Sequence, residues 1–153
     1  MVRIALITVM VCTLTYCSPV RAAPPAQADT IAAHLGFFGY ETETTDEFLR
    51  ANHPSNLNIA IKEHRGGVLF LSFLGASAYG KENPNELMAL ANELNVNATV
   101  SRSYVDKDGD LALEAWFPGT YEKARFSLFL EEWNKDTILQ LRQHTEEVDK
   151  LFD

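Results

Sequence analysis

Alternating apolar and polar positions in the middle of the chain predict two adjacent antiparallel strands. In residues 57–62 the apolar side chains are Leu57, Ile59 and Ile61, which is the period of a strand with one buried face. Residues 68–74 follow an Arg-Gly-Gly turn and are apolar almost throughout, as in a central strand with both faces covered. These two segments therefore predict the centre of a sheet.

Three further strands are predicted from the sequence, a short one at residues 40–45 and two longer ones at 99–106 and 111–117. Residues 46–56 contain Pro54, which breaks regular structure, so we predict an irregular segment there.

Segments with helical periodicity alternate with these strands. The first covers residues 26–38, and the second begins at Asn83-Pro84, since proline is favoured in the first turn of a helix. The third is a long helix after Pro118-Gly119-Thr120, with a bend predicted at Asn134-Lys135-Asp136. The apolar stripes of the second and third helices are Leu87, Leu90, Ala91 and Leu94, and Phe126, Phe129, Leu130 and Trp133.

The order of these elements indicates the fold class. Strands joined by tight turns alternate with helices, without a long series of strand–helix units. This order predicts an α+β fold, in which an antiparallel β-sheet has flanking helices on one face and the chain ends in a long C-terminal helix.

The segment VDKDGDLALEAWF contains three aspartates, spaced like the first ligands of an EF-hand calcium loop. Its first, third and fifth ligand positions are Asp106, Asp108 and Asp110. The sixth position is Leu111 where the loop needs glycine, and the twelfth is Phe117 where it needs a bidentate glutamate. The pattern favours a structural turn, with a weak calcium site at the three aspartates as the alternative.

The turn chemistry predicts a hairpin of defined register. Asp108-Gly109 is a preferred two-residue turn, because both positions tolerate a positive φ. It pairs Asp106 with Leu111, Tyr104 with Leu113, Arg102 with Ala115, and Val100 with Phe117. One face then collects Val100, Tyr104, Leu111, Leu113, Ala115 and Phe117, and the other collects Ser101, Ser103, Glu114 and Trp116. A three-residue loop would place Asp106 opposite Asp110 and mix the two faces, so we predict the two-residue turn.

The N-terminus has the features of a secretory signal peptide. A short basic start precedes eleven apolar residues, 4–14, and small residues suited to cleavage after Ala22 or Ala23 follow. The apolar run is shorter than the roughly 20 residues of a spanning helix, so we expect no stable membrane insertion after cleavage. The alternatives are an uncleaved anchor and a lipoprotein modified at Cys17, although Tyr16 is too bulky for a lipobox.

Charge and cysteine content argue against nucleic-acid binding and against thiol chemistry. Loss of residues 1–22 removes Arg3, Arg21 and both cysteines, and leaves 11 basic and 21 acidic residues, a net charge near −10. A chain of this charge is not expected to bind nucleic acid. Without cysteine, an exported chain has no disulfide and no thiol chemistry.

Few other residues indicate chemistry. The four histidines are separate in sequence, and no dinucleotide or phosphate-binding motif is present, so no cofactor is predicted. The stretch around Ser77 is similar to a nucleophile elbow, but its second glycine comes one residue late. A hydrolase using Ser77 and a histidine is therefore only a minor alternative.

An ordered set of features within residues 87–133 supports a resemblance to a known family. A helix ends in the asparagine-rich stretch 92–97, a strand enters a Y-x-D-x-D-G-D turn, and a second strand and a long helix with aromatic anchors follow. The turn residues are Tyr104, Asp106, Asp108, Gly109 and Asp110. In this order the features resemble the YbjN-domain family of bacterial proteins, over roughly residues 28–145.

The resemblance implies a fold similar to that of type III secretion chaperones, which are often dimeric. It also implies a loosely described role in sensory transduction regulation, without established catalytic residues. The turn residues are then architectural. We accordingly divide the chain into a signal peptide at 1–22, a linker at 23–28 and a YbjN-like domain at 29–153.

These observations predict an exported, periplasmic or secreted protein that is not an enzyme and that binds a protein partner or a second copy of itself. Trp116 is expected to point from the outer face of the sheet beside Glu114, and an exposed tryptophan is a common binding anchor. The partner-binding residues predicted from the sequence are therefore Trp116 and Glu114.

Overall fold

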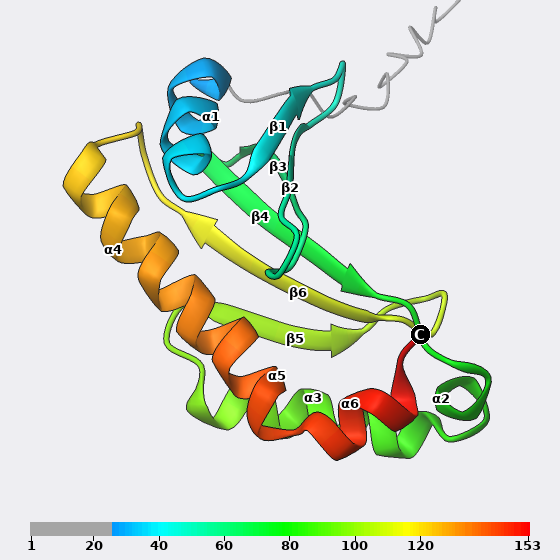
Figure 1. The fold of residues 1–153 in the computed structure, drawn as a ribbon. Helices are drawn as coiled ribbons and strands as arrows, with labels where there is room; N and C mark the ends of the chain where they lie inside the picture. The colour runs from blue at the N-terminus through cyan, green and yellow to red at the C-terminus, as the bar shows by residue number, and fades with distance from the viewer. Residues whose placement is uncertain (1–25) are drawn as a thin grey trace, which may run out of the picture.

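The computed structural model describes residues 26–153 of the chain (Figure 1). The predicted signal peptide at residues 1–22, the lipoprotein alternative at Cys17 and residues 23–25 of the predicted linker lie outside the described residues. Within the described part, no helix is long and apolar enough to cross a membrane.

The strands of residues 26–153 form one six-stranded sheet, in the order β1-β2-β3-β4-β6-β5, and every neighbouring pair is antiparallel. The strands are β1 Glu41–Thr44, β2 Leu49–Asn52, β3 Ile59–His64, β4 Gly67–Leu74, β5 Ser101–Val105 and β6 Leu111–Phe117. The predicted antiparallel sheet is confirmed, and β4 and β6 lie inside it, with β1 and β5 at its edges.

The helices are α1 Ala28–Phe37, α2 Ala78–Glu82, α3 Pro84–Asn97, α4 Lys123–Asn134, the π-helix η1 Lys135–Leu139, α5 Gln140–Gln143 and α6 Thr145–Leu151. The predicted bend in the C-terminal helix is where the π-helix begins. The short helix α2 was not predicted from the sequence.

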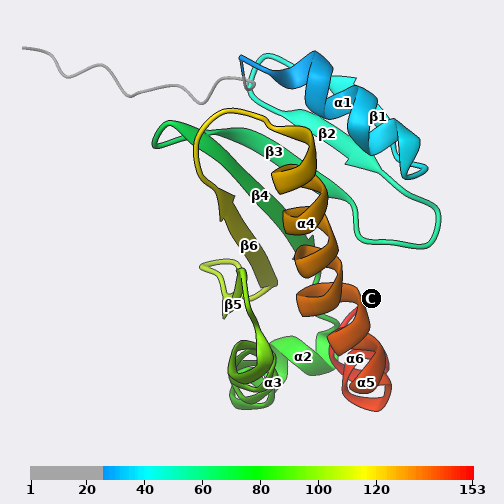
Figure 2. The same ribbon diagram turned by 90° about the vertical axis from the view of Figure 1, so that its left-hand side faces the viewer.

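The core lies between one face of the sheet, called here the inner face, and the helices. Figure 2 shows α1 and α4 on the same side of the sheet. Phe70 on β4 packs edge-on against Phe129 and Trp133 of α4, with ring centroids 5.1 and 5.7 Å apart. Phe117 on β6 contacts the same helix at Phe126, at 5.4 Å. Interlocking aromatic rings of this kind hold α4 against the two central strands.

The prediction of an irregular segment at residues 46–56 is wrong for residues 49–52, which form strand β2. Strand β2 pairs with β1 on one side and β3 on the other. Its side chains alternate, with Leu49 and Ala51 buried in the core. Four residues are too few to show a clear alternation of apolar and polar side chains in the sequence. The segment is a strand because it pairs with β1 and β3.

The predicted register of the β5–β6 hairpin is also wrong. Asp106 lies opposite Asp110, with its N–H donating to the Asp110 carbonyl at 2.9 Å, so the loop holds three residues. Gly109 occupies the left-handed region at φ 85°, and its N–H donates to the Asp106 carbonyl at 3.2 Å. This is the geometry of a type I turn followed by a bulge glycine.

The one-residue shift moves the side chains of β5 to the opposite faces. Tyr104 pairs with Ala112 on the outer face of the sheet, whereas it was predicted to pair with Leu113 on the core side. Ser103 pairs with Leu113 and is buried on the inner face. The faces predicted for β6 are confirmed, because Leu111 and Leu113 are in the core and Trp116 is outside.

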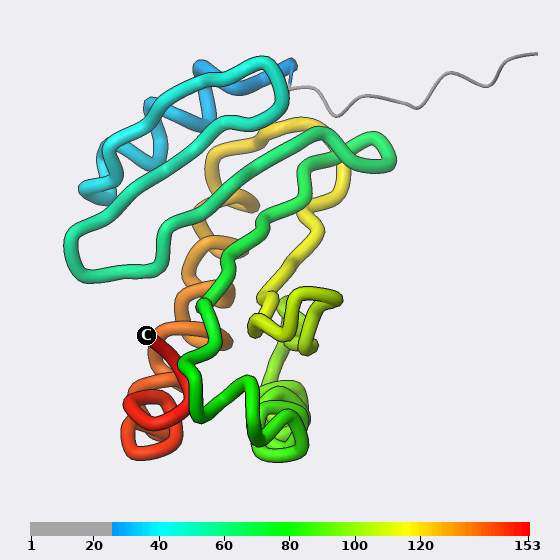
Figure 3. The backbone as a smooth tube through the Cα atoms, turned by 90° about the vertical axis from the view of Figure 1, so that its right-hand side faces the viewer, coloured from blue at the N-terminus to red at the C-terminus, as the bar shows by residue number. Residues whose placement is uncertain are grey.

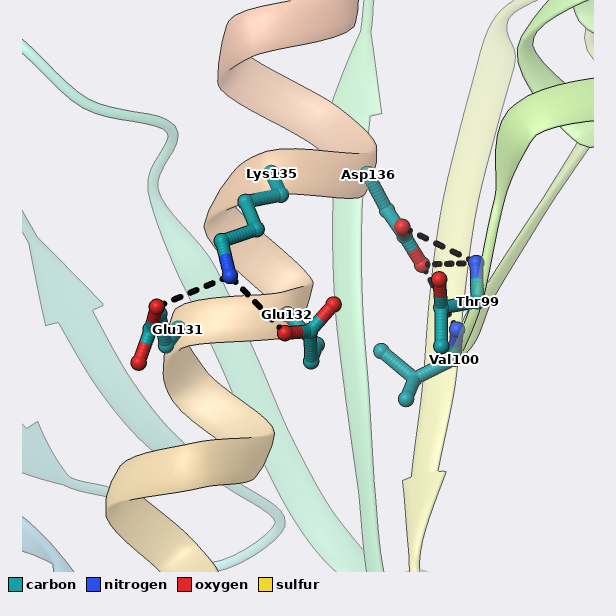
Figure 4. A network of polar contacts seen from close by, with 6 residues as sticks. All are labelled: Thr99, Val100, Glu131, Glu132, Lys135 and Asp136. Carbon is teal, nitrogen blue, oxygen red and sulfur yellow. Dashed lines mark hydrogen bonds and ion pairs between the residues drawn. The ribbon is translucent and has the colours of Figure 1, made fainter.

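Asparagine and aspartate side chains bind the backbone where α3 leads into β5. Asn95 donates to the Ser103 carbonyl at 2.8 Å and accepts from the Ser103 N–H at 2.7 Å, so it pairs with backbone groups of an edge strand. Asp136, which is only 3% exposed, accepts from the N–H groups of Thr99, Val100 and Ser101 at 2.6 to 2.9 Å. Figure 4 shows its carboxylate pointing at Thr99 and Val100.

The π-helix places two neighbouring residues in different environments. Lys135 forms ion pairs with Glu131 and Glu132 at 2.8 and 2.9 Å on the solvent side, while Asp136 points toward the start of β5 (Figure 4). Thr137 donates to the Trp133 carbonyl at 2.7 Å inside the core. A π-helical turn often marks a specialised position, and here it directs a carboxylate inward.

The end of the chain returns to the sheet. Phe152 forms a bridge with Ala76 just beyond β4, and the Ser77 N–H donates to the Leu151 carbonyl at 2.9 Å. Figure 3 shows the C-terminus beside the segment that leaves β4. The C-terminal helices are therefore held at both ends, by aromatic packing at α4 and by backbone pairing after α6.

We predict that Asp136→Ala lowers the free energy of unfolding by about 3 kcal/mol, because three amides lose a charged acceptor. Urea unfolding followed by circular dichroism measures this change. Glu131→Ala on the same helix is the matched control, since it removes only a solvent-exposed ion pair and should shift the midpoint little. An Asp136→Ala variant as stable as the control would contradict the structural role of the carboxylate.

Candidate functional site

The outer face of the sheet carries a patch of apolar and aromatic side chains. Cross-strand partners share a face, so the register defines its rows. One row is Lys62, Leu69 and Trp116; the second is Glu43, Arg50, Ala60, Leu71, Glu114 and Arg102; the third is Phe73, Ala112 and Tyr104. We call these residues the outer-face patch. The helices of residues 26–153 lie on the inner face or at the sheet edge, so no layer of helices covers the patch (Figure 2).

Three aromatic side chains are the most exposed apolar members of the patch. The exposed fractions are 55% for Phe73, 46% for Trp116 and 38% for Tyr104. Leu69 and Leu71 between them are nearly buried, although β4 was predicted to have a second layer over this face. Neighbouring side chains rather than a helix shield these leucines. The patch therefore has a flat aliphatic centre with aromatic rings around it.

Trp116 lies where the sequence predicts, on the outer face, and its ring is held in place by one polar contact. Its indole N–H donates to the His64 carbonyl at 3.1 Å, at the end of the β3–β4 hairpin. This bond fixes the orientation of the ring while leaving about half of its surface in water. An amphipathic ring that is both oriented and exposed is typical of an interface anchor.

Glu114 is nearly buried and pairs within the sheet. Its carboxylate accepts from the Tyr104 hydroxyl at 3.0 Å and forms an ion pair with Arg102 on the neighbouring strand. Burial raises the pKa of the Tyr104 hydroxyl, and the hydrogen bond to Glu114 raises it further, so the phenol remains a donor. The Arg102 guanidinium lies 5.8 Å from the centre of the Tyr104 ring. Glu114 thus orients two exposed side chains.

Basic residues lie at the margins of the patch. Lys62 ends the first row and Arg102 ends the second, Arg50 lies near the other end of the second row opposite Glu43, and Arg65 lies in the turn beside Trp116. A hollow of about 270 Å³ next to Trp116 is lined by His64, Arg65 and Arg102 among others. Glu114 also lines this hollow and pairs with Arg102, so Arg65 is the arginine of the hollow whose charge is not matched by that pair.

The three aspartates of the family-like turn serve different backbone and side-chain partners. Asp106 accepts from the N–H groups of Asp108 and Asp110 at 2.9 and 3.0 Å. The Asp108 carboxylate pairs with Lys107, and that of Asp110 accepts from the Ala76 N–H at 2.9 Å. In the described part of the chain, no group of three or more histidine, cysteine, aspartate or glutamate side chains is arranged to hold a metal ion. The geometry gives the calcium alternative no support.

Ser77 has a capping role in the structure. Its side chain accepts from the Gly80 N–H at 3.0 Å and donates to the Lys150 carbonyl at 2.9 Å. It is the N-cap of α2, and no histidine is among these contacts. The minor alternative of a hydrolase using Ser77 therefore gains no support from the geometry.

Sequence reasoning missed Phe73 and Tyr104 as members of the patch. Phe73 belongs to an apolar strand that was predicted to be covered on both faces. Tyr104 was assigned to the core because of the incorrect hairpin register. The sequence held a signal for the correct face of Tyr104. The glycine at position 109 suits the bulge of a three-residue loop as well as a two-residue turn, and that loop places Tyr104 on the outer face.

Comparisons with known proteins identify the fold. No protein-family model matches the chain, and no curated protein matches it. A solved structure does match, that of YbjN from E. coli, which is described as a candidate transcription regulator. The TM-score is 0.63 and the identity 13%, over 82% of this chain and 94% of the YbjN chain. At this identity the likeness shows the fold alone, and the predicted YbjN-like α+β fold is confirmed.

We predict that Asp106→Ala lowers the free energy of unfolding by about 1–2 kcal/mol, because the turn loses the acceptor for two N–H groups. Asp108→Ala is the matched control and should leave the unfolding midpoint nearly unchanged, since its carboxylate binds only an exposed lysine. Thermal unfolding with and without millimolar calcium checks both variants. Equal stability of the two variants, or a calcium-dependent rise in Tm that both abolish, would contradict the structural interpretation of the turn.

Proposed function

We propose that this chain is an exported, non-enzymatic binding module with a regulatory or chaperone-like role, acting through a protein partner on the outer-face patch. The observation that carries the proposal is the oriented and exposed Trp116, on the same sheet face as Tyr104 and Phe73, without a helical layer over that face. Export is proposed from the signal-peptide pattern of residues 1–22.

The arrangement of the patch fits a protein interface. Interfaces combine a water-excluding centre, rich in aromatic residues, with a polar and charged rim. Leu69 and Leu71 supply such a centre, the aromatic rings surround it, and arginine and lysine side chains lie at the margin. The binding energy is expected to concentrate on Trp116, because tryptophan is enriched among residues that dominate association.

The proposed regulatory role is supported by the similarity in fold to YbjN. YbjN from E. coli is described as a candidate transcription regulator, and the role proposed for this chain is regulation through protein contact. Direct binding to nucleic acid is not proposed, because a chain with 21 acidic and 13 basic residues is repelled by the phosphate backbone. The partner is either a different protein or a second copy of this chain.

A photo-crosslinking phenylalanine analogue placed at position 73, which is 55% exposed within the patch, should capture the partner in cells that produce the protein. With the captured partner purified, Trp116→Ala should weaken association by about 30-fold or more, as expected for a dominant anchor residue. If the captured protein is a second copy of this chain, the self-association of the wild type and of Trp116→Ala is compared by analytical ultracentrifugation.

Leu128→Ala is the matched control, because Leu128 is exposed on α4, away from the outer face. This variant should bind with unchanged affinity, and both variants should keep the wild-type circular dichroism spectrum. A protein that stays monomeric and yields no specific crosslink from position 73 would contradict the proposal, as would equal losses in the two variants.

A further inference from the structure

A groove runs along the opposite side of the molecule, between α1 and α4. Two hollows of about 380 and 540 Å³ make up this groove, and Phe38 and Ser127 line both of them. Volumes of this size are typical of sites for small molecules. We call the two hollows together the α1–α4 groove. It belongs to the helical side of the molecule and shares no residue with the outer-face patch.

The larger hollow has mostly apolar walls. Leu130 forms part of its floor, and Ile138, Leu139 and Phe38 line its sides. Phe38 and Leu139 are each about half exposed, and Phe37 at the mouth of the smaller hollow is 87% exposed. Large apolar side chains held this far in water around a concave surface indicate a ligand-binding role.

The smaller hollow contains a fixed polar cluster. The His34 ring is 8% exposed, with Nδ1 at 2.9 Å from the Tyr121 hydroxyl and Nε2 at 3.3 Å from the Ser127 hydroxyl. The ring stacks on Phe38 and meets the edge of Phe126. These contacts hold the imidazole in one orientation.

The protonation state of His34 leaves a hydrogen-bond donor free. Burial lowers the pKa of His34 and Lys123 lowers it further, so the ring is neutral at neutral pH. A neutral imidazole has one N–H donor and one acceptor nitrogen. In either tautomer, one of the hydroxyls of Tyr121 and Ser127 therefore receives the ring N–H and keeps its own hydrogen for another acceptor.

A cation lies at the same end of the groove. Lys123 lines the smaller hollow, and none of residues 26–153 forms an ion pair with it. An ammonium group and a free hydroxyl donor together suit a carboxylate. The apolar larger hollow continues from this point past Phe38.

We propose that the α1–α4 groove binds a fatty-acid-type ligand, with the carboxylate at Lys123 and at whichever of the Tyr121 and Ser127 hydroxyls receives the His34 N–H, and the alkyl chain along Phe38, Leu130 and Ile138. The charge of the groove supports this ligand class. Among the described residues that line the smaller hollow, the charged one is Lys123, which lies where the carboxylate is proposed to bind, whereas Lys135 in the larger hollow is already paired with Glu131 and Glu132. This site is separate from the proposed protein interface and does not depend on it.

Calorimetric titration of the folded protein with decanoate, below its micellar concentration, tests the proposal. One decanoate per chain is expected to bind saturably. Decanol, which has the same chain without the charge, should bind at least tenfold more weakly, because it lacks the partner for Lys123. Decyltrimethylammonium should not bind.

Matched variants test whether decanoate binds in the α1–α4 groove. Phe38→Ala should weaken decanoate binding about tenfold, while Phe73→Ala, at a similarly exposed aromatic on the outer face, should leave it unchanged. Lys123→Gln should weaken decanoate but not decanol, and Lys81→Gln on α2 is its control. Trp116→Ala should bind decanoate with wild-type affinity. The decanoate result therefore stands whether or not the outer-face patch proves to be a protein interface.

Three outcomes would overturn the proposal. They are the absence of saturable decanoate binding to the wild-type protein, equal affinities for decanoate and decanol, and equal effects of Phe38→Ala and Phe73→Ala.

Discussion

The position of the C-terminal helix depends on one buried carboxylate. Asp136 accepts hydrogen bonds from three consecutive backbone amides, which lead into the edge strand β5 at Ser101. A carboxylate with 3% exposure is costly unless backbone dipoles compensate its charge, and here the three N–H groups do so. The same contact ties the helical layer to the last strand of the sheet. The geometry of the β5–β6 hairpin therefore depends on a residue distant from it in the sequence.

This arrangement makes the two faces of the sheet different. On the inner face, the rings of Phe70, Phe117 and the α4 aromatics interlock, so the helices have a single docked position. On the outer face, the ordered side chains interact mainly with one another. Glu114 holds Arg102 and Tyr104, and the His64 carbonyl holds Trp116. The helical side thus supports a surface whose side chains are already ordered, which would lower the entropic cost of binding the proposed partner.

Local sequence patterns were sufficient for most of the fold. Period-two alternation located β3, helical spacing located α3 and α4, and the aspartate-rich turn was correctly recognised as a hairpin rather than an EF-hand. These features are local, because each depends on neighbours along the chain. The likeness to YbjN then confirmed the overall arrangement.

The errors arose where distant contacts decide the structure. The separation of apolar from polar residues favoured a two-residue turn, but the bulge at Gly109 and the bonds made by Asp106 favour the three-residue loop. The shift buries Ser103, whose backbone is paired with Asn95 from α3. Neither this pairing nor the role of Asp136 follows from a local pattern. For the same reason, Tyr104 and Phe73 were missed as members of the outer-face patch.

A partner that covers the outer-face patch in the cell, as proposed above, would shield its aromatic side chains from solvent. Hydroxyl-radical footprinting of the protein, in producing cells and after purification, measures this directly as side-chain oxidation. We predict that Trp116, Tyr104 and Phe73 are readily oxidised in the purified chain and strongly protected in cells, while the exposed Leu128 is oxidised equally in both. Equal oxidation of the three aromatic residues in the two samples would contradict a protein interface on this face.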